Sequence, residues 1–320
     1  MAVHVIVGAG PVGSGVARLL AAAGHEVRVL TRSGGGAADL AGHPAVRRER
    51  VDAADAAALT RAASGADVLY NCVNPPYHRW ASDWPPVADA LLTAAAASGA
   101  VLVTMANLYG YGEVSAPMTE DTPLAATGVK GQVRNRMWAD ALAAHRAGRV
   151  RVTEARASDF YGPGAVANAV LGERFAVPVL AGRTAWVIGD PDAPHSWSYL
   201  PDVAAALVLL GSDERAWGRA WHVPAAPPAS QREMARGLAR AAGAPEPTVR
   251  AIPAAVMSAA GLVSPALREL RETRHQFTRP FVLDSTAYTE TFGVTATPAA
   301  EALEATAAWW RARAATPAAA

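Results

Sequence analysis

Three glycines near the start of the chain have the spacing of a phosphate-binding turn. Gly8, Gly10 and Gly13 follow the apolar run Val3–Val7 and precede a helical pattern. In a G-x-G-x-x-G turn the first glycine bends the chain, the second lets a pyrophosphate approach, and the third lets helix and strand pack closely. The helix that follows offers unpaired N–H groups and the positive end of its dipole. We therefore predict a dinucleotide site formed by Gly8, Gly10, Pro11, Val12 and Gly13.

The residues after the second apolar strand favour one form of the dinucleotide. Thr31, Arg32 and Ser33 follow that strand, and no acidic residue is among them. An acid here would accept a hydrogen bond from the ribose 2′-hydroxyl of NAD(H), whereas a guanidinium suits the 2′-phosphate of NADP(H). The sequence therefore predicts NADP(H) in preference to NAD(H); the alternative is that Arg32 is a solvated charge. Asp52, after the third strand, either faces the adenine or caps a helix.

Composition and charge exclude several classes of protein. Hydrophobic residues make up 51% of the 320-residue chain and the net charge is +1, so we expect a large core and no nucleic-acid or membrane partner. The cluster Arg47, Arg48 and Arg50 is expected to be a solvated loop. Cys72 is the only cysteine, and no cluster has metal-ligand spacing, so we predict neither a disulfide nor a metal site. Without a leader or a long apolar run, the expected location is cytoplasmic.

The elements that would position these residues alternate as strands and helices. This alternation predicts an α/β fold, a Rossmann-type doubly wound parallel sheet with a smaller C-terminal substrate lobe. We assign residues 1–164 to the NADP-binding domain, with 191–221 returning to it, and residues 165–190 and 222–320 to the substrate-binding lobe. Helix Val87–Ser98 and a capping box at Ser230–Glu233 are predicted along the way.

Ligands of such sheets bind beyond the carboxyl ends of the strands, so the loops there are candidates for the site. The loop Asn74–Trp80 contains two prolines and two aromatic residues. It would border the nicotinamide; the alternative is a packed surface turn. The predicted cofactor contacts are Cys72, Val73, Asn74 and Thr104. The predicted substrate contacts are Tyr77, Trp80 and Asn107, although Asn107 suits a local turn equally well.

Several short motifs occur in the order of a known family. They are the glycine turn, Asp67–Cys72, Leu108-Tyr109-Gly110, Glu120-Asp121-Thr122-Pro123, Tyr161-Gly162-Pro163-Gly164, His195–Val203 and Ser230–Glu233. With them the chain resembles the extended or atypical short-chain dehydrogenase/reductases, the NAD-dependent epimerase/dehydratase group. The resemblance spans nearly the whole chain. It implies one doubly wound sheet, a nicotinamide cofactor and a substrate lobe.

The chain departs from that family at its catalytic residues. The family uses Tyr-x-x-x-Lys, in which the lysine holds the nicotinamide ribose and lowers the pKa of the tyrosine. Lys130 matches the lysine, but Ala126 stands in the tyrosine position and Met105 in that of the usual serine. Another group must therefore move the proton. Tyr109 and Tyr161 are the predicted donors, Lys130 itself is a weaker candidate, and a packing role is the alternative for both tyrosines.

Two further groups are candidate substrate contacts. Arg134 lies one helical turn after Lys130 and would face an anionic substrate group, unless that helix face meets a second subunit. The resemblance implies such helix pairing, so a homodimer is possible. His195 and Trp197 stand where the family lines its substrate pocket, although a single histidine is also often structural.

Three functions remain open at this stage. The first is an NADP(H)-dependent oxidoreductase that transfers hydride to or from a carbonyl, alcohol or activated alkene of a small organic molecule, with a non-standard proton donor. The second is a nucleotide-sugar epimerase or dehydratase, which would need the missing phenol. The third is a catalytically inactive NADP-binding sensor or partner protein.

Overall fold

The computed structural model describes residues 1–166, 169–257, 269 and 271–315. The chain forms two compact units. Unit 1 consists of Met1–Gly112, Glu120–Ala157 and Val203–Val223, and unit 2 of Glu113–Thr119, Ser158–Asp202 and Pro224–Ala320. No helix in the described ranges is both long and apolar enough to cross a membrane.

Unit 1 is built on a seven-stranded sheet in which every strand pair is parallel. The strand order is β10-β6-β5-β4-β1-β2-β3, and the chain reverses direction across the sheet between β1 and β4. The strands are β1 (Val3–Val7), β2 (Glu26–Thr31), β3 (Val46–Arg50), β4 (Val68–Asn71), β5 (Val101–Asn107), β6 (Arg151–Ala157) and β10 (Ala220–His222). The predicted Rossmann-type doubly wound fold is confirmed, and such a reversal is where ligands bind.

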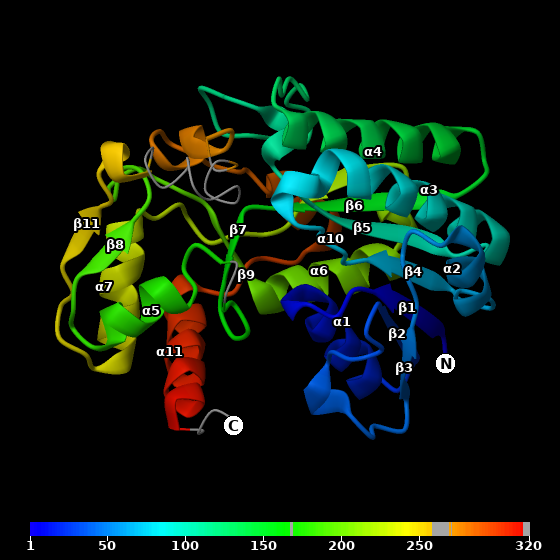
Figure 1. The fold of residues 1–320 in the computed structure, drawn as a ribbon, viewed down its shortest axis with the longest axis horizontal. Coiled ribbons are helices and arrows are strands. Elements are labelled where there is room, and N and C mark those ends of the chain that lie inside the picture. The colour runs from blue at the N-terminus through cyan, green and yellow to red at the C-terminus, as the bar shows by residue number, and fades with distance from the viewer. Residues whose placement is uncertain (167–168, 258–268, 270, 316–320) are drawn as a thin grey trace. The chain divides into compact units, whose positions relative to one another are not determined.

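Helices cover both faces of this sheet (Figure 1). One face carries α1 (Pro11–Ala22) and α6 (Leu200–Ser212), and the other carries α3 (Trp80–Ser98) and α4 (Val129–Arg146), with α2 (Ala56–Ala62) packed against α3. A Cβ on Gly15 would lie 3.0 Å from the Cβ of Ala204, so α1 and α6 approach closely. Coverage on both faces explains why β4 is buried along its whole length.

Helix α3 begins earlier than the sequence predicts. The predicted start is Val87, whereas α3 begins at Trp80 and contains both Pro85 and Pro86. A proline inside a helix costs about 3 kcal/mol because it removes a hydrogen bond. The buried side chains of Trp80 and Trp84 offset this cost, since each tryptophan removes a large apolar area from water.

Unit 2 contains two small parallel sheets and several helices. Strand β7 (Asp159–Tyr161) pairs with β9 (Trp197–Tyr199), and β8 (Ala185–Val187) pairs with β11 (Val249–Ala251). The helices are α5 (Glu173–Leu180), α7 (Gln231–Ala242), α10 (Thr286–Phe292) and α11 (Ala299–Ala315). The capping box at the start of α7 is confirmed, because Ser230 Oγ accepts from Glu233 N and Glu233 Oε2 accepts from Ser230 N.

The boundary between the units differs from the predicted domain boundary. Residues 158–164 and 191–202 were assigned to the cofactor domain, whereas they belong to unit 2. The reason is that β7 and β9 pair with each other and not with the seven-stranded sheet. Short 3₁₀ helices complete the chain at Ala38–Leu40 (η1), Tyr77–Arg79 (η2), Tyr109–Tyr111 (η3), Glu214–Ala216 (η4) and Arg274–Phe277 (η5).

Candidate active site

The glycine turn joins β1 to α1 at the reversal point of the sheet. Gly8 has φ +100°, and a Cβ there would lie 2.6 Å from the carbonyl oxygen of Cys72. A Cβ on Gly13 would overlap the carbonyl oxygen of Gly8, whereas a Cβ on Gly10 would meet nothing within 4 Å. Two glycines are thus needed for packing and the third faces open space. Pro11 and Val12 open α1, and Gly10 caps it without a side-chain bond, so this helix end suits a pyrophosphate.

The end of β4 lies against the glycine turn. The backbone N–H of Cys72 donates to Val7 O, and Asn71 Oδ1 accepts from Val73 N. Burial raises the pKa of the Cys72 thiol to about 12, which disfavours its reactive thiolate form. Asn74, the next predicted cofactor contact, is exposed.

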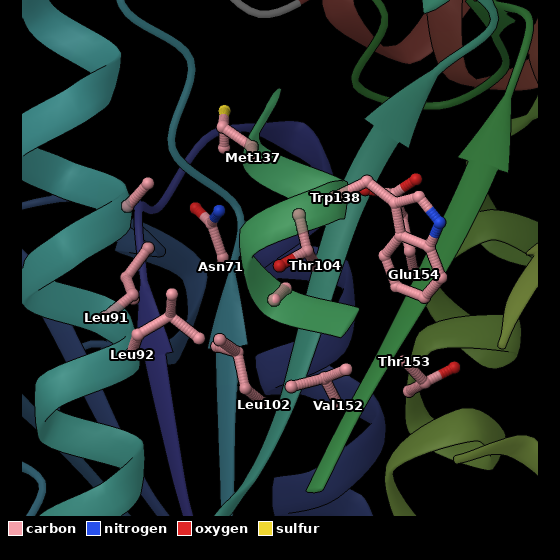
Figure 2. Close-up of a pocket in the computed structure, with 12 residues that line it drawn as sticks. Asn71, Leu91, Leu92, Leu102, Thr104, Met137, Trp138, Val152, Thr153 and Glu154 are labelled. Carbon is pink, nitrogen blue, oxygen red and sulfur yellow. The ribbon is translucent and has the colours of Figure 1, made fainter. Parts of the chain in front are cut away.

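The side chain of Thr104 lines a small pocket and does not lie at the glycine turn. It lines a pocket of about 20 Å³ between the sheet and helices α3 and α4, together with Asn71 and Glu154 (Figure 2). This volume suits one water molecule and no larger ligand. The role of Thr104 toward the cofactor stays a prediction, and the structure places its side chain on the face covered by α3 and α4.

Beyond β2, a loop folds back over the glycine turn. Thr31 Oγ1 donates to Gly35 O, and Ser33 Oγ accepts from Gly35 N, so both hydroxyls shape the loop. A Cβ on Gly36 would overlap the side chain of Ala9 in the turn. Arg32 is exposed at the start of this loop.

Two arginines of β3 lie beside the same loop. Arg50 is the register partner of Thr31, and Arg48 Nη1 donates to Gly36 O at 3.4 Å. The short third strand predicted before Asp52 is confirmed here as β3, so the interpretation of the arginine cluster as a solvated loop is wrong. Within the described part of the chain, Arg32, Arg48 and Arg50 form no ion pair with an acidic side chain. Sequence analysis missed Arg48 and Arg50 because strand register, and not sequence distance, brings them to the loop.

Asp52 makes only a local contact. Its Oδ1 accepts from Ala54 N at 3.0 Å, and its side chain is exposed. The residue that caps α2 is Asp55, whose Oδ1 accepts from Ala58 N. Helix capping therefore belongs to Asp55, and an adenine contact of Asp52 stays a prediction.

At the other half of the sheet edge, two phenols meet beside a buried lysine. Tyr77 of η2 and Tyr109 of η3 place their hydroxyl oxygens 2.9 Å apart. Lys130 is 1% exposed, and its Nζ lies 5.9 Å from the centre of the Tyr77 ring. The structure thus joins the predicted lysine and the predicted donor Tyr109 to a residue that the sequence assigned to substrate binding.

Trp80 and Arg134 are packed behind this phenol pair. Trp80 is 1% exposed, stacks on Tyr109 with ring centres 6.0 Å apart, and donates its Nε1–H to Pro75 O. Arg134 is also buried, against the ring of Trp80. A direct substrate contact of either residue stays a prediction, which their enclosure by neighbouring side chains opposes. Asn107 Oδ1 accepts from Tyr109 N at 3.2 Å, which is the local turn that the sequence left open.

A buried polar network lies at the ends of β6 and β10. Arg156 bridges Glu154 and the Tyr111 hydroxyl, each at 2.8 Å, and the Tyr111 hydroxyl lies 2.7 Å from His222 Nε2. Burial raises the pKa of Tyr111. These groups satisfy one another and hold three strand ends together, so we interpret them as structural support.

In unit 2, His195 is enclosed by aromatic rings. Its ring stacks on Phe277 with centres 5.3 Å apart, and its Nε2 lies 3.0 Å from Asp159 Oδ2 and 3.3 Å from Ser158 Oγ. Because hydroxyl and carboxylate share one nitrogen, this set lacks the geometry of a nucleophilic triad. Nδ1 lies 3.0 Å from the carbonyl oxygen of Gln276.

The other predicted residues of unit 2 are also enclosed. Trp197 donates its Nε1–H to Ala229 O, and both Trp197 and Tyr161 are buried. Burial raises the pKa of Tyr161, which makes its phenol a weaker acid than an ordinary tyrosine. A catalytic role of Tyr161 stays a prediction that this environment opposes.

Solved structures of similar fold cover almost the whole chain. They include a double mutant of dTDP-glucose 4,6-dehydratase from Streptomyces venezuelae with NAD bound (22% identity, TM-score 0.79, 97% of each chain covered). They also include UDP-glucose 4-epimerase from Thermotoga maritima with UDP-glucose (16% identity, TM-score 0.80, 98% of this chain and 99% of that chain). At these identities the likeness shows the fold. No curated protein sequence matches the chain.

The sequence itself also matches a family model. The model of the NAD dependent epimerase/dehydratase family matches residues 4–221, which include the glycine turn, Tyr109 and Lys130. The resemblance inferred from the sequence motifs is thereby confirmed. The match covers more than half of the chain. The chain therefore belongs to the NAD dependent epimerase/dehydratase family.

Proposed function

We propose that this protein is an NADP(H)-dependent oxidoreductase that transfers hydride to or from a carbonyl, alcohol or activated alkene of a small organic molecule. The observation that carries this proposal is the phenol pair beside the lysine. Tyr77 and Tyr109 share a 2.9 Å hydrogen bond, and Lys130 lies over the Tyr77 ring. The pair supplies the acidic hydroxyl that Ala126 removes from the family pattern.

The residues of unit 1 fit a nicotinamide dinucleotide. The open space at Gly10 and the free helix end suit its pyrophosphate, and Lys130 suits the nicotinamide ribose. Arg32, Arg48 and Arg50 surround the loop after β2 and suit a 2′-phosphate, which an acid would repel. The Streptomyces venezuelae dehydratase structure contains NAD, so the preference for NADP(H) is proposed from this chain's own arginines.

The protein's part in the reaction is to move a proton. A bound nicotinamide supplies or accepts the hydride. In the direction of reduction, Tyr109 donates its hydroxyl proton to the substrate oxygen, and the bond between that oxygen and hydrogen forms as the phenol loses it. Tyr77 then donates a hydrogen bond to the phenolate, and the ammonium of Lys130 stabilises the negative charge. Oxidation of an alcohol runs the same steps in reverse.

A second candidate is a nucleotide-sugar dehydratase or epimerase. It is favoured by the two structures named above, a sugar-nucleotide dehydratase and an epimerase, whose folds match almost the whole chain. That chemistry also begins with removal of a hydroxyl proton, a task open to Tyr109. A catalytically inactive NADP-binding protein is the third candidate, and it predicts binding without turnover.

The test combines binding with turnover. The purified protein is titrated with NADPH and with NADH, and tighter binding of NADPH is expected. Loss of nicotinamide absorbance is then followed with a panel of carbonyl compounds and activated alkenes, and a parallel arm uses UDP-glucose and dTDP-glucose. Equal affinities for the two dinucleotides would contradict the cofactor preference. Turnover confined to the sugar nucleotides would favour the second candidate.

A further inference from the structure

Arg134 is a buried cation with incomplete hydrogen bonding. It is 7% exposed, its Nη1 donates to Met105 O at a long 3.4 Å, and its Nε finds no partner among the described residues. Burial lowers the pKa of Arg134 to about 10, so the guanidinium is still charged at neutral pH. A buried charge is costly unless something compensates it, and groups kept under such conditions are often functional.

Two indole rings provide the compensation. The guanidinium carbon lies 4.8 Å from the ring centre of Trp80 and 4.3 Å from that of Trp84, which is the geometry of cation–π attraction. Trp80 in turn stacks on Tyr109 and meets Tyr77 edge to face at 5.1 Å. A continuous line of contacts therefore runs from Arg134 through Trp80 to both phenols.

The charge around the phenol pair is also set by its neighbours. The titratable groups on the neighbouring elements include Lys130 and Arg134 of α4, Glu154 and Arg156 of β6, Tyr111 of η3, His78 and Arg79 of η2, and Asp83 of α3. Glu154 pairs with Arg156 at 2.8 Å, and Asp83 pairs with Arg79 at 3.0 Å. Lys130 and Arg134, one helical turn apart on α4, both place a cationic side chain near the phenols.

We propose that Arg134 is a positioning residue that fixes the Tyr77–Tyr109 pair through Trp80 and whose charge favours loss of a proton from that pair. This inference rests on the proposed function for its catalytic meaning. It replaces the expected role of Arg134 as a direct substrate contact. The second cation of α4 thus assists Lys130 in lowering the pKa of the proton donor.

The experiment titrates tyrosine ionisation in the free protein by ultraviolet difference absorbance. Burial raises the pKa of Tyr70, Tyr111, Tyr161 and Tyr199, so these phenols ionise late. The ionisation step that disappears in Tyr109→Phe is assigned to the phenol pair. In Arg134→Leu that step should move upward by about one pH unit or more, since a nearby charge shifts a pKa by about 1–3 units. Arg136→Leu removes an exposed arginine of the same helix and should leave the step in place.

The outcomes separate this inference from the proposed function, because the titration needs neither cofactor nor substrate. An unchanged step in Arg134→Leu, or the absence of a step that depends on Tyr109, would overturn the inference. Circular dichroism and thermal unfolding check that the variant is folded; if it is not, Arg134→Lys is judged by the same criterion, with a smaller upward shift expected. If Arg134→Leu shifts the ionisation step as expected but Tyr109→Phe keeps full turnover, Tyr109 is not the proton donor. The inference about Arg134 would still hold.

Discussion

The two halves of the sheet's carboxyl edge follow different rules. Around β1 to β3, the glycine turn keeps the spacing of its motif, and each glycine has its expected surroundings. Around β4 to β6, the motif is broken at Ala126, and phenols from two other segments take up the space beside Lys130. The first half keeps the residue spacing of its motif, whereas the second supplies a phenol hydroxyl from other positions in the sequence.

The difference follows from what each half must do. A backbone turn against a strand end leaves no room for a side chain, because a Cβ on Gly13 would overlap Gly8 O. Only one residue type fits, and only at one spacing. Proton transfer needs a hydroxyl within hydrogen-bond distance of the reacting oxygen. Any loop that reaches this point can supply it, as η2 and η3 do here.

The largest predicted effect concerns the broken half. Tyr109→Phe should lower kcat by roughly 10²- to 10⁴-fold, the usual contribution of a general acid, and should leave NADPH affinity unchanged. Single-turnover oxidation of NADPH with an active carbonyl substrate measures this loss. Tyr161→Phe is the matched comparison and should keep its turnover. If Tyr161→Phe lost activity and Tyr109→Phe did not, the assignment of Tyr109 as the proton donor would be wrong.

His4, at the amino end of β1, tests whether a buried titratable residue must also be part of the active site. Burial, together with the neighbouring His25, lowers the pKa of His4 to about 4. The unfolded chain binds this proton more readily, so the contribution of His4 to stability is complete above about pH 6.5 and is lost as the pH falls toward 4. The shift corresponds to roughly 3 kcal/mol.

Urea unfolding at about pH 7 and about pH 4.5 measures this loss. His4→Gln should flatten the difference, whereas His43→Gln, in a surface loop, should not. NADPH turnover should be the same in both variants at neutral pH. A His4→Gln variant that folds normally but loses turnover would remove the distinction drawn here between a buried group and a functional one.

In the half of the sheet edge around β1 to β3, two glycine variants separate a packing role from a binding role. Gly13→Ala must displace the backbone of Gly8, so it should cost about 1–3 kcal/mol of stability and also weaken NADPH binding. Gly10→Ala places its methyl group in open space, so it should keep its melting temperature and lose only NADPH affinity. Thermal unfolding and fluorescence titration with NADPH distinguish the two effects. Equal loss of melting temperature in both variants would show that Gly10 is also a packing position.

What the sequence could predict follows the same division. The glycine turn, the parallel doubly wound sheet and the capping box at Ser230 depend on local spacing, and local spacing is visible in a sequence. The contact of Tyr77 with Tyr109 depends on two loops whose paths are set by tertiary packing, so no spacing rule reveals it. The burial of Trp80 and Arg134 was missed for the same reason, since periodicity indicates a helix face but not what covers it.

The smallest predicted effect concerns Arg32 and its neighbours. Both sequence spacing and strand register bring these arginines together. The place of Arg32 after β2 is a matter of spacing, but Arg50 joins it only through the register of β3 with β2. A hydrogen bond to a charged group contributes about 1.5–3 kcal/mol when it is buried and less when it is exposed. Arg32→Ala should therefore reduce the preference for NADPH over NADH by about tenfold, and Arg50→Ala by less.

Competition binding of the two dinucleotides at low and high salt measures this preference. Arg61→Ala, an exposed arginine of α2, should change neither affinity. Because a phosphate contact is electrostatic, added salt should reduce the preference in the wild type and have little effect in Arg32→Ala. If Arg50→Ala has the larger effect, then strand register and not the residue following β2 sets cofactor choice. Cofactor choice would in that case depend on tertiary arrangement in the β1–β3 half of the sheet edge as well.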